Sequence, residues 1–409
     1  MSAAHSFDRY LKFSIACALT LLLLVSGVNV LIDPFAIFST PEITGINQRK
    51  TEFFKHIRLV KAYAIRRLQP DVLLLGNSRA ELALDPMHPA LNQISDRVYN
   101  AALSGGTIYE SFRYLQHGHR FRPIKLAMLG LDKGMFESFT QPDFDEGILS
   151  VSADGRVNAV TFSTLIRTAL SLETFAASMQ TFFKQKSTAA REYRSNGMYR
   201  PENSDRSVEH EDGHHALFVK TLVKVGEAGD EQVLRTEPTR MYRYFRRLLD
   251  FCRAEKIDLR LYIHPVHAWA EENYAALAQR ESVAQWKHEI VAILAEEAGT
   301  NGAPFPLWDF SGHNSVTSEA VPSRQDRAKR MQYYWEPLHY TQATGDLILD
   351  RMFDRRAGNR EMPPDFGVRL TKDNVAQVIA QSHIQRQRYR ELFFGDVVEI
   401  ERIVKGSTK

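Results

Sequence analysis

The sequence predicts an α/β protein whose parallel sheet follows one membrane-spanning helix. After residue 70, continuous apolar segments alternate with helical segments along the 409-residue chain. Strands that are apolar on both sides are typical of a parallel sheet covered by helices on each face. Near the N-terminus, residues 13–32 (FSIACALTLLLLVSGVNVLI) carry no charge. A helix of that length crosses the roughly 30 Å core of a bilayer.

The uncharged run is expected to be an uncleaved single-pass anchor. Arg9 and Lys12 precede it and Asp33 follows it. Positive charge on the N-terminal side predicts that residues 1–12 stay in the cytoplasm and that the rest is exported. A cleaved signal peptide is one alternative, but no small-x-small cleavage site follows the run. A buried core helix is the other, although so long an uncharged run is hard to bury in a water-soluble fold.

The elements beyond the anchor follow in order. Residues 33–69 are expected to form an irregular juxtamembrane segment that contains an amphipathic helix over 51–68. Buried strands of the main domain, residues 70–356, are expected at 71–75, 97–100, 124–131, 259–264 and 305–310. The helices that accompany them are expected at 107–119, 238–255, 271–298 and 342–356.

Two segments stand apart from this alternation. Residues 138–235 are interpreted as an insertion that caps the sheet and acts as a lid over the site. The insertion contains a helical part at 160–185 and a polar loop at 194–215. Residues 357–409 are expected to be a peripheral C-terminal segment with a charged helix at 371–395.

A serine follows the first predicted strand. In DVLLLGNSRAELALDP, residues 71–86, Ser78 comes three residues after the apolar run, between Asn77 and Arg79. Sites in open parallel sheets form at the carboxyl ends of the strands, so this turn is a suitable place for a nucleophile. The motif differs from the G-x-S-x-G elbow because position 80 is alanine. A plain turn is the alternative interpretation.

The candidate partners of the serine lie near the other end of the chain. A serine hydroxyl needs a base, and the base needs an acceptor that orients it. In YYWEPLHYTQATGDLIL, residues 333–349, Glu336 and His339 are three residues apart on a segment that enters a helix. This spacing lets the carboxylate hold one imidazole nitrogen while the other faces the serine. A capping or buried histidine is the alternative for His339.

A glycine-rich turn and an acidic residue belong to the same predicted edge. Ser104-Gly105-Gly106 follows the second strand and precedes a helix, and Asp132 follows the third strand. Glycine lets backbone N–H groups approach a ligand closely, and a helix N-terminus favours negative charge. The turn is therefore a candidate oxyanion site. A plain loop is the alternative.

This order of blocks resembles the SGNH (GDSL-like) hydrolases. The blocks are a serine turn, a glycine after strand two, a polar residue after strand three and an acid-x-x-His near the C-terminus. The resemblance covers residues 70–135 and 236–356. Its most specific match is LHYTQATGDLIL. The chain looks most similar to membrane-anchored SGNH-like proteins of bacterial polysaccharide and cell-envelope O-acylation systems. The resemblance implies a flavodoxin-like three-layer α/β/α fold. It also implies Ser78 as nucleophile, His339 as base, and backbone N–H groups of Ser78 and Gly105 as oxyanion donors.

Two residues depart from the family pattern. Glu336 stands where the family usually has aspartate, and its extra methylene still lets it orient a histidine. Asp132 stands where the family usually has asparagine. An ionised carboxylate there would repel a developing oxyanion. Asp132 is therefore expected to be neutral, turned away, or bonded to Arg79 or Lys133.

Other constellations carry weaker signals. His264 and His267 end the fourth strand and are expected to line the substrate cleft, with metal ligation as an alternative. The histidines of HEDGHH, residues 210–215, are expected to belong to a solvated loop rather than a metal site. Aromatic residues near strand ends either pack in the core or stack on sugar rings: Trp269, Trp308, Tyr333, Tyr334 and Trp335.

No metal, cofactor or nucleic acid is expected. The chain has neither a P-loop nor a G-x-G-x-x-G motif, and its net charge is only +3. The leading hypothesis is an O-acyl (acetyl) transferase or esterase of the bacterial inner membrane, acting in the periplasm on a cell-envelope or exported polysaccharide. Its partners would be an acyl donor and polysaccharide assembly proteins. The alternatives are a catalytically silent, membrane-tethered scaffold and a structural membrane protein whose serine turn has no role.

Overall fold

The computed structural model describes residues 2–137, 144–152, 156–158, 161–187, 192–232, 238–277, 279–355 and 361–407. The chain forms two compact units. The N-terminal unit comprises Met1–Arg67 and Pro142–Tyr193, and the sheet unit comprises Leu68–Gln141 and Arg194–Lys409. The stretch 138–235, expected as a single insertion, is thus divided between the two units. Its ends, residues 138–143 and 233–235, lie outside the described residues.

A six-stranded, mostly parallel sheet forms the centre of the sheet unit. Its strands are β1 (Val72–Leu75), β2 (Val98–Asn100), β3 (Leu126–Leu131), β4 (Asp258–Ile263), β5 (Leu307–Asp309) and β8 (Val368–Leu370). The order across the sheet is β2-β1-β3-β4-β5-β8, and only β8 is antiparallel to its neighbour. The five predicted strands are all present. The sixth, β8, was not predicted.

Two groups of helices flank the sheet. One group comprises α3 (Ser78–Ala83), α4 (Pro89–Asn92) and α14 (Gln342–Phe353), and the other comprises α5 (Ile108–Phe121), α11 (Pro238–Ala254) and α13 (Arg280–Asn301). Val72 and Leu74 share a core cluster with Leu347 of α14. Leu73 and Leu75 point to the opposite face of the pleat and are equally buried. Both faces of the sheet are therefore covered, as continuous apolar strands predict.

Several expectations for the sheet unit were wrong in detail. The polar loop expected at 194–215 contains helix α9 (Pro201–His210) and the start of α10 (His214–Gln232). Proline at the first position suits the start of α9, and positive φ at Gly213 marks the turn that separates the two helices. The helix expected at 271–298 is two helices, α12 (Ala268–Ala276) and α13.

The last part of the chain packs onto the sheet unit. The expected helix at 371–395 is α15 (Val375–Leu392), and α16 (Phe394–Ser407) follows it. Helix α16 contacts both α10 and α12, and Trp269 Nε1 donates to Asp396 Oδ2 at 3.0 Å. The segment before α14 is a two-stranded antiparallel hairpin, β6 (Tyr334–Glu336) and β7 (His339–Tyr340). The short helix α6 (Gly134–Glu137) follows β3.

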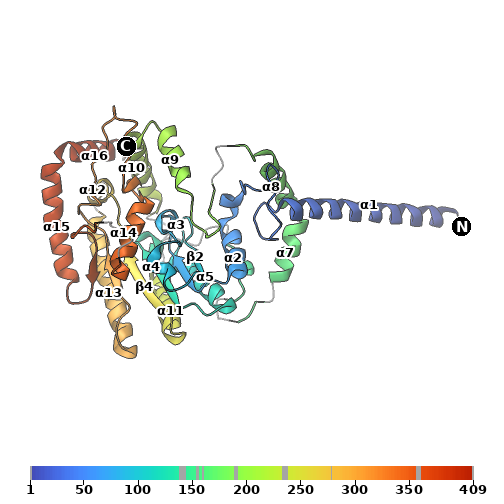
Figure 1. The fold of residues 1–409 in the computed structure, drawn as a ribbon, viewed down its shortest axis with the longest axis horizontal. Coiled ribbons are helices and arrows are strands. Elements are labelled where there is room, and N and C mark those ends of the chain that lie inside the picture. Colours follow the sequence, from blue (N-terminus) through green and yellow to red (C-terminus); the bar gives the residue numbers. More distant parts are fainter. Residues whose placement is uncertain are drawn as a thin grey trace. The chain divides into compact units, whose positions relative to one another are not determined.

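The N-terminal unit is built on the long helix α1 (Ser2–Ile32) (Figure 1). Its stretch Phe7–Ile32 is long and apolar enough to cross a membrane. The helix ends at Asp33, which has φ +47° and accepts a hydrogen bond from Ile37 N at 2.8 Å. The other elements of the unit are η1 (Phe53–His56), α2 (Ile57–Leu68), η2 (Glu146–Ile148), α7 (Thr161–Leu170) and α8 (Leu172–Phe183). Their small core includes Phe35, Val60, Tyr63 and Ala177.

Candidate functional site

The turn after β1 presents Ser78 at the first residue of α3. Gly76 has φ +138°, and a Cβ there would lie 3.1 Å from Ala80 Cβ and 3.2 Å from Gly130 O. Only glycine fits both the backbone conformation and the space. Asn77 is the N-cap, and its Oδ1 accepts a hydrogen bond from Arg79 N at 3.0 Å. The sequence thus forms a sharp strand-to-helix turn with Ser78 at the carboxyl end of the sheet.

The β6–β7 hairpin and α14 bring the far end of the chain to this turn. A Cβ on Gly345 would lie 2.0 Å from Ala83 O. The glycine therefore allows α14 to pack directly on the backbone of α3. Thr341 Oγ1 donates to Gln332 O at 2.6 Å and fixes the junction between hairpin and helix. This packing explains how His339 reaches a serine that lies 261 residues earlier in the sequence.

Ser78, His339 and Glu336 form a continuous hydrogen-bonded chain. Ser78 Oγ lies 2.8 Å from His339 Nε2. His339 Nδ1 is hydrogen-bonded to Glu336 Oε1, and Glu336 Oε2 accepts from Leu338 N at 3.0 Å. A carboxylate on Nδ1 selects the tautomer in which Nε2 is free to accept the serine proton. The His339 side chain is 30% exposed and Ser78 is half-buried, so neither residue is sealed from solvent.

The environment keeps Glu336 ionised. Burial alone would raise the pKa of this carboxyl, but His339, the Leu338 N–H group and Arg79 together lower it below its usual range. A charged Glu336 is what the arrangement needs, because a neutral acid would not stabilise an imidazolium on His339. The geometry can therefore transfer a proton from Ser78 to His339 and hold the resulting positive charge.

Asp132 is held by an ion pair with Arg79 and a hydrogen bond from Asn77. Asp132 Oδ2 forms an ion pair with Arg79 Nη1 and accepts a hydrogen bond from Asn77 Nδ2. Its Oδ1 accepts from Met135 N at 3.1 Å. Arg79 Nε also donates to Leu338 O at 2.8 Å, beside His339. Arg79 thus links the serine turn, the histidine hairpin and the end of β3. Burial works against the charge of Arg79, but Asp132 outweighs it and raises the pKa of the guanidinium.

The glycine turn after β2 lies against the serine turn. Leu103 N donates to Gly76 O at 3.0 Å, and a Cβ on Gly106 would lie 2.9 Å from the same oxygen. Gly105 is exposed and has φ +64°. Thr107 and Glu110 then start α5 with a capping box. The structure places Gly105 next to the Ser78 turn, and the role of its N–H group as an oxyanion donor stays a prediction.

The two histidines after β4 differ in their surroundings. His264 Nδ1 is 2.8 Å from Tyr340 OH, and its ring occupies space that Gly130 leaves open, because a Cβ there would lie 2.3 Å from His264 Cε1. Burial, with Arg79, holds the pKa of His264 well below its usual value, so its ring is neutral. His267 caps α12, and its Nε2 donates to Glu319 O at 2.8 Å. His264 lines a cavity, whereas His267 is engaged in local structure.

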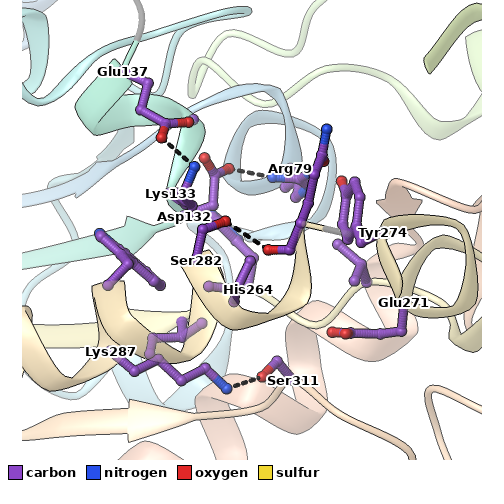
Figure 2. Close-up of a pocket in the computed structure, with 16 residues that line it drawn as sticks. Arg79, Asp132, Lys133, Glu137, His264, Glu271, Tyr274, Ser282, Lys287 and Ser311 are labelled. Atoms are coloured by element: carbon purple, nitrogen blue, oxygen red, sulfur yellow. Dashed lines mark hydrogen bonds and ion pairs between the residues drawn. The ribbon is translucent and has the colours of Figure 1, made fainter. Parts of the chain in front are cut away.

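The cavity of about 200 Å³ extends from Arg79 and Asp132 toward α12 and α13 (Figure 2). Its wall includes His264, Tyr274 and Trp286. Within the described part of the chain, the buried Trp286 Nε1 of this wall has no hydrogen-bond partner. Burial raises the pKa of Tyr274 to about 12, so its hydroxyl is protonated and can donate. The cavity offers an aromatic and polar wall, and Arg79 and Asp132 connect it to the serine turn, although Ser78 and His339 are not among its lining residues.

Sequence reasoning missed part of this wall. Tyr274, Gln279, Ser282 and Trp286 come from helices α12 and α13 and the turn between them, and no motif marks them. The only available signal was their position after β4, at the carboxyl edge of the sheet. Among the predicted aromatic residues, Trp269 and Tyr334 are buried in the core, as the packing interpretation expects.

The expected solvated loop at 210–215 is wrong for His214 and His215, which take part in packing contacts, whereas the His210 side chain is exposed. His214 Nδ1 lies 3.0 Å from Trp335 O, and its Nε2 accepts from Met331 N at 3.2 Å. His215 Nε2 is 3.2 Å from Glu399 Oε1. Among the described residues, no three His, Cys, Asp or Glu side chains are grouped to hold a metal ion.

A scan of the chain against protein-family models gave no match, and a search of curated proteins gave none either. The function is therefore argued from the geometry of the site.

Proposed function

We propose that this chain is a membrane-anchored SGNH-like O-acyltransferase or esterase that works through a serine acyl-enzyme. The observation that carries the proposal is the hydrogen-bonded chain of Ser78, His339 and Glu336 at the carboxyl edge of a parallel sheet. Nucleophile, base and orienting carboxylate are recognised by this geometry rather than by their order in a sequence.

The reaction has two steps. Ser78 Oγ attacks the carbonyl carbon of an O-acyl donor while His339 Nε2 takes the serine proton. The tetrahedral intermediate then expels the donor alcohol, which receives that proton from His339, and an acyl-Ser78 ester remains. In the second step a sugar hydroxyl or water gives its proton to His339 and attacks the ester carbonyl. Ser78 Oγ then leaves and takes that proton back from His339, and an acylated sugar or a free acid is released. Glu336 stabilises the imidazolium in both steps.

Charge around the oxyanion supports the same chemistry. The backbone N–H of Ser78 at the start of α3 and that of Gly105 are the proposed donors to the intermediate. Asp132 is held by Arg79 and Asn77, so its negative charge is compensated beside the site. Compensation answers the main objection to activity, which is that a carboxylate replaces the asparagine of the family pattern.

The sheet topology supports the resemblance to SGNH hydrolases. The order β2-β1-β3-β4-β5 is that of flavodoxin-like doubly wound sheets. In such sheets, ligands bind at the carboxyl ends of β1 and β3, where successive connections diverge to opposite sides. Ser78 follows β1 and Asp132 follows β3. A three-layer α/β/α domain of this family is the fold we propose.

The proposed location follows from α1. Arg9 and Lys12 near its start predict a cytoplasmic N-terminus, so the sheet unit would lie outside the cytoplasm, at a bacterial inner membrane. An acyltransferase there would meet exported or cell-envelope polysaccharide and its assembly proteins. The aromatic and polar cavity beside Arg79 would hold the sugar or the acyl group. A scaffold without catalysis is the second candidate, and the replacement of asparagine by Asp132 favours it.

The test is covalent labelling of the full-length protein in detergent with a fluorophosphonate probe. We expect wild-type protein to be labelled, and Ser78→Ala and His339→Ala to lose labelling. Ser323→Ala is the matched control and should keep wild-type labelling, since Ser323 is exposed, does not line the cavity, and its hydroxyl donates to Asp326 Oδ2 at 3.2 Å. Labelling that persists in Ser78→Ala, or a folded wild type that stays unlabelled, would reject the enzyme and favour the scaffold.

A further inference from the structure

Helix α8 of the N-terminal unit carries its apolar side chains on its exposed face. Leu172 and Phe183 are 74% and 75% exposed, and Ala176 and Met179 lie between them. Their spacing of i, i+4, i+7 and i+11 places the four residues on one face of the helix. A helix on the surface of a water-soluble protein turns such a face toward the core. The reverse arrangement indicates an apolar environment outside the protein.

The buried face of α8 is small and polar. Thr174, Ser178 and Thr181 are buried at positions i, i+4 and i+7, and Ala177 lies among them. Ser178 Oγ donates to Asn29 Oδ1 of α1 at 3.0 Å. Small and hydroxylated residues at a helix–helix contact are typical of membrane proteins, in which backbones approach closely and polar groups bond across the interface. The exposed apolar face and the buried small, polar face of α8 therefore both indicate a membrane environment.

Helices α7 and α8 meet at the last turns of the apolar span of α1. Asn29 Nδ2 donates to Ala169 O at 2.9 Å and to Ser171 O at 3.0 Å, at the joint between the two helices. Asn29 lies three residues before Ile32, where the apolar stretch ends. Ile166 of α7 is 45% exposed near this joint. Figure 1 shows both helices at this end of α1.

The lengths of α1 and α8 indicate how deep in the bilayer the contact between the two helices lies. The uncharged run of α1, residues 13–32, is about 30 Å long as a helix, which matches the hydrocarbon core. Its final turns therefore reach the headgroup layer. Helix α8, with 12 residues, is about 18 Å long and cannot span the core. A helix of this kind lies in the interface with its apolar face among the acyl chains nearest the headgroups.

We propose that the apolar face of α8 (Leu172, Ala176, Met179 and Phe183), together with Ile166 of α7, rests in the interfacial layer of the bilayer that α1 crosses. The occupant of this face is lipid. The inference rests on α1 crossing a membrane and does not depend on the proposed catalytic chemistry. It gives the N-terminal unit a second contact with the membrane, in addition to α1.

The experiment places an environment-sensitive fluorophore at single cysteines of the full-length chain in vesicles of phosphatidylethanolamine and phosphatidylglycerol. The Leu172→Cys and Phe183→Cys variants carry Cys17→Ala as well. Cys252 is buried, and burial raises its pKa, so it does not react. Glu173→Cys is the matched control, because Glu173 is a neighbour of Leu172 on the same helix with a side chain 79% exposed. Quenchers are a lipid with a nitroxide near the headgroup and aqueous iodide.

We expect labels at 172 and 183 to be quenched more strongly by the nitroxide lipid than the label at 173, and less strongly by iodide. Equal quenching by iodide at all three positions would place the face in water and overturn the proposal. Protection of 172 and 183 from both quenchers would mean that protein covers the face, which also overturns it. The two test positions guard against local disturbance by either substitution.

A separate arm tests the anchor itself. In the unmodified chain, the exposed Cys17 of α1 carries the label. We expect this label to be quenched by a lipid whose nitroxide lies deep in the acyl chains. A Cys17 label that only iodide quenches would show that α1 does not cross the bilayer, and the proposal for α8 would fail with it. The fluorophosphonate test of Ser78 is independent of either result.

Discussion

Two glutamate–histidine pairs of the sheet unit share the same chemistry in different surroundings. Glu336 bonds His339, whose other ring nitrogen meets Ser78 Oγ and whose side chain is 30% exposed. Glu272 faces His313 at 3.3 Å, but both side chains are almost completely buried, at 2% and 4% exposure. A glutamate–histidine pair is thus not a catalytic feature by itself. The second nitrogen of the imidazole has to reach a nucleophile, and the ring has to be accessible.

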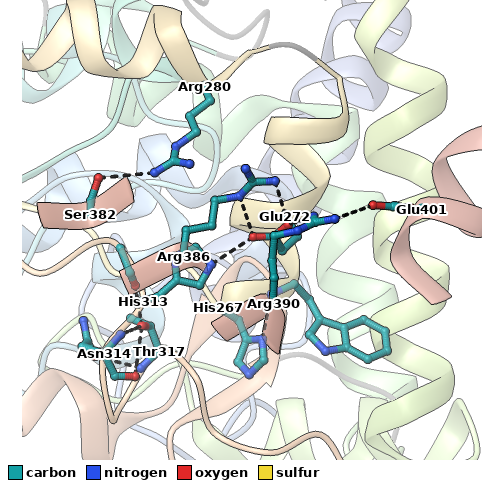
Figure 3. A network of polar contacts seen from close by, with 12 residues as sticks. His267, Glu272, Arg280, His313, Asn314, Thr317, Ser382, Arg386, Arg390 and Glu401 are labelled. Carbon is teal, nitrogen blue, oxygen red and sulfur yellow. Dashed lines mark hydrogen bonds and ion pairs between the residues drawn. The ribbon is translucent and has the colours of Figure 1, made fainter. Parts of the chain in front are cut away.

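The two glutamate–histidine pairs also differ in which carboxylate the nearby arginines bind. Arg386 Nε and Arg390 Nη1 each donate to Glu272 at 2.7 Å, and Arg390 continues to Glu401 (Figure 3). These bonds tie α15 and α16 to α12. Near the candidate site, Arg79 pairs with Asp132, and Glu336 is left to hold His339. The first network holds helices together, and the second leaves the hydrogen-bonded chain of Ser78, His339 and Glu336 intact.

The largest expected effect comes from exchanging each glutamate for its amide. Glu336→Gln should slow fluorophosphonate labelling by about 10²–10⁴-fold, because an amide neither fixes the His339 tautomer nor stabilises the imidazolium. Glu272→Gln should leave the labelling rate unchanged and lower the melting temperature. Rates of labelling and melting curves of both variants test this contrast. If Glu336→Gln reacted at the wild-type rate, the distinction between the two pairs would collapse.

The next effect concerns Arg79. Arg79→Met removes the link to Leu338 O and leaves Asp132 without its cation, so we expect labelling to slow by about 10²-fold, the loss typical of a small misplacement of reacting groups. Adding Asp132→Asn should recover part of the rate, since the uncompensated negative charge beside the oxyanion is then gone. Labelling rates of the single and double variants provide the measurement. Without any recovery, Arg79 would act only by holding the hairpin of His339.

The contrast also shows what local sequence patterns can predict. The five parallel strands were predicted because β1 and β3 are continuous apolar runs and the other three are mostly apolar segments in the same alternation with helices. Ser78, Glu336 and His339 were singled out because strand-to-helix turns and acid-x-x-His spacing are local signals. Strand β8 was missed because its three residues include exposed Val368 and Arg369 at the edge of the sheet. The split between α12 and α13 was missed because no glycine or proline marks it.

Long-range packing could not be predicted from these patterns. The ion pair of Arg79 with Asp132 was one of several arrangements that the sequence allowed, and only the packing of the strands selects it. Gly345 illustrates the same limit. Its place in LHYTQATGDLIL suggested a family motif, whereas its physical role, contact with the backbone of α3 at Ala83, appears only when α14 is packed.

The smallest expected effect is the acid dependence of the buried pair. Burial alone would raise the pKa of Glu272, but His313, Arg386 and Arg390 outweigh it and lower the pKa from 4.5 to about 2. A carboxyl with a lowered pKa in the folded state stabilises the fold above its unfolded pKa. This stabilisation should be lost as the pH falls from about 4.5 to about 2. The hydrogen bonds to this charged group suggest a contribution of about 1–3 kcal/mol.

Tryptophan fluorescence isolates this effect, because all four tryptophans, Trp269, Trp286, Trp308 and Trp335, belong to the sheet unit. Between about pH 4.5 and about pH 2, the melting temperature of the wild-type protein should fall more steeply than that of Glu272→Gln, because the amide has no proton to gain. If the melting temperatures of the two proteins fell in parallel with pH, Glu272 would not be ionised in the folded state. The network around Glu272 would then stabilise the fold by packing rather than by ion pairing. A steeper wild-type profile, with labelling of Ser78 unchanged at neutral pH in Glu272→Gln, would separate the structural pair from the reactive one.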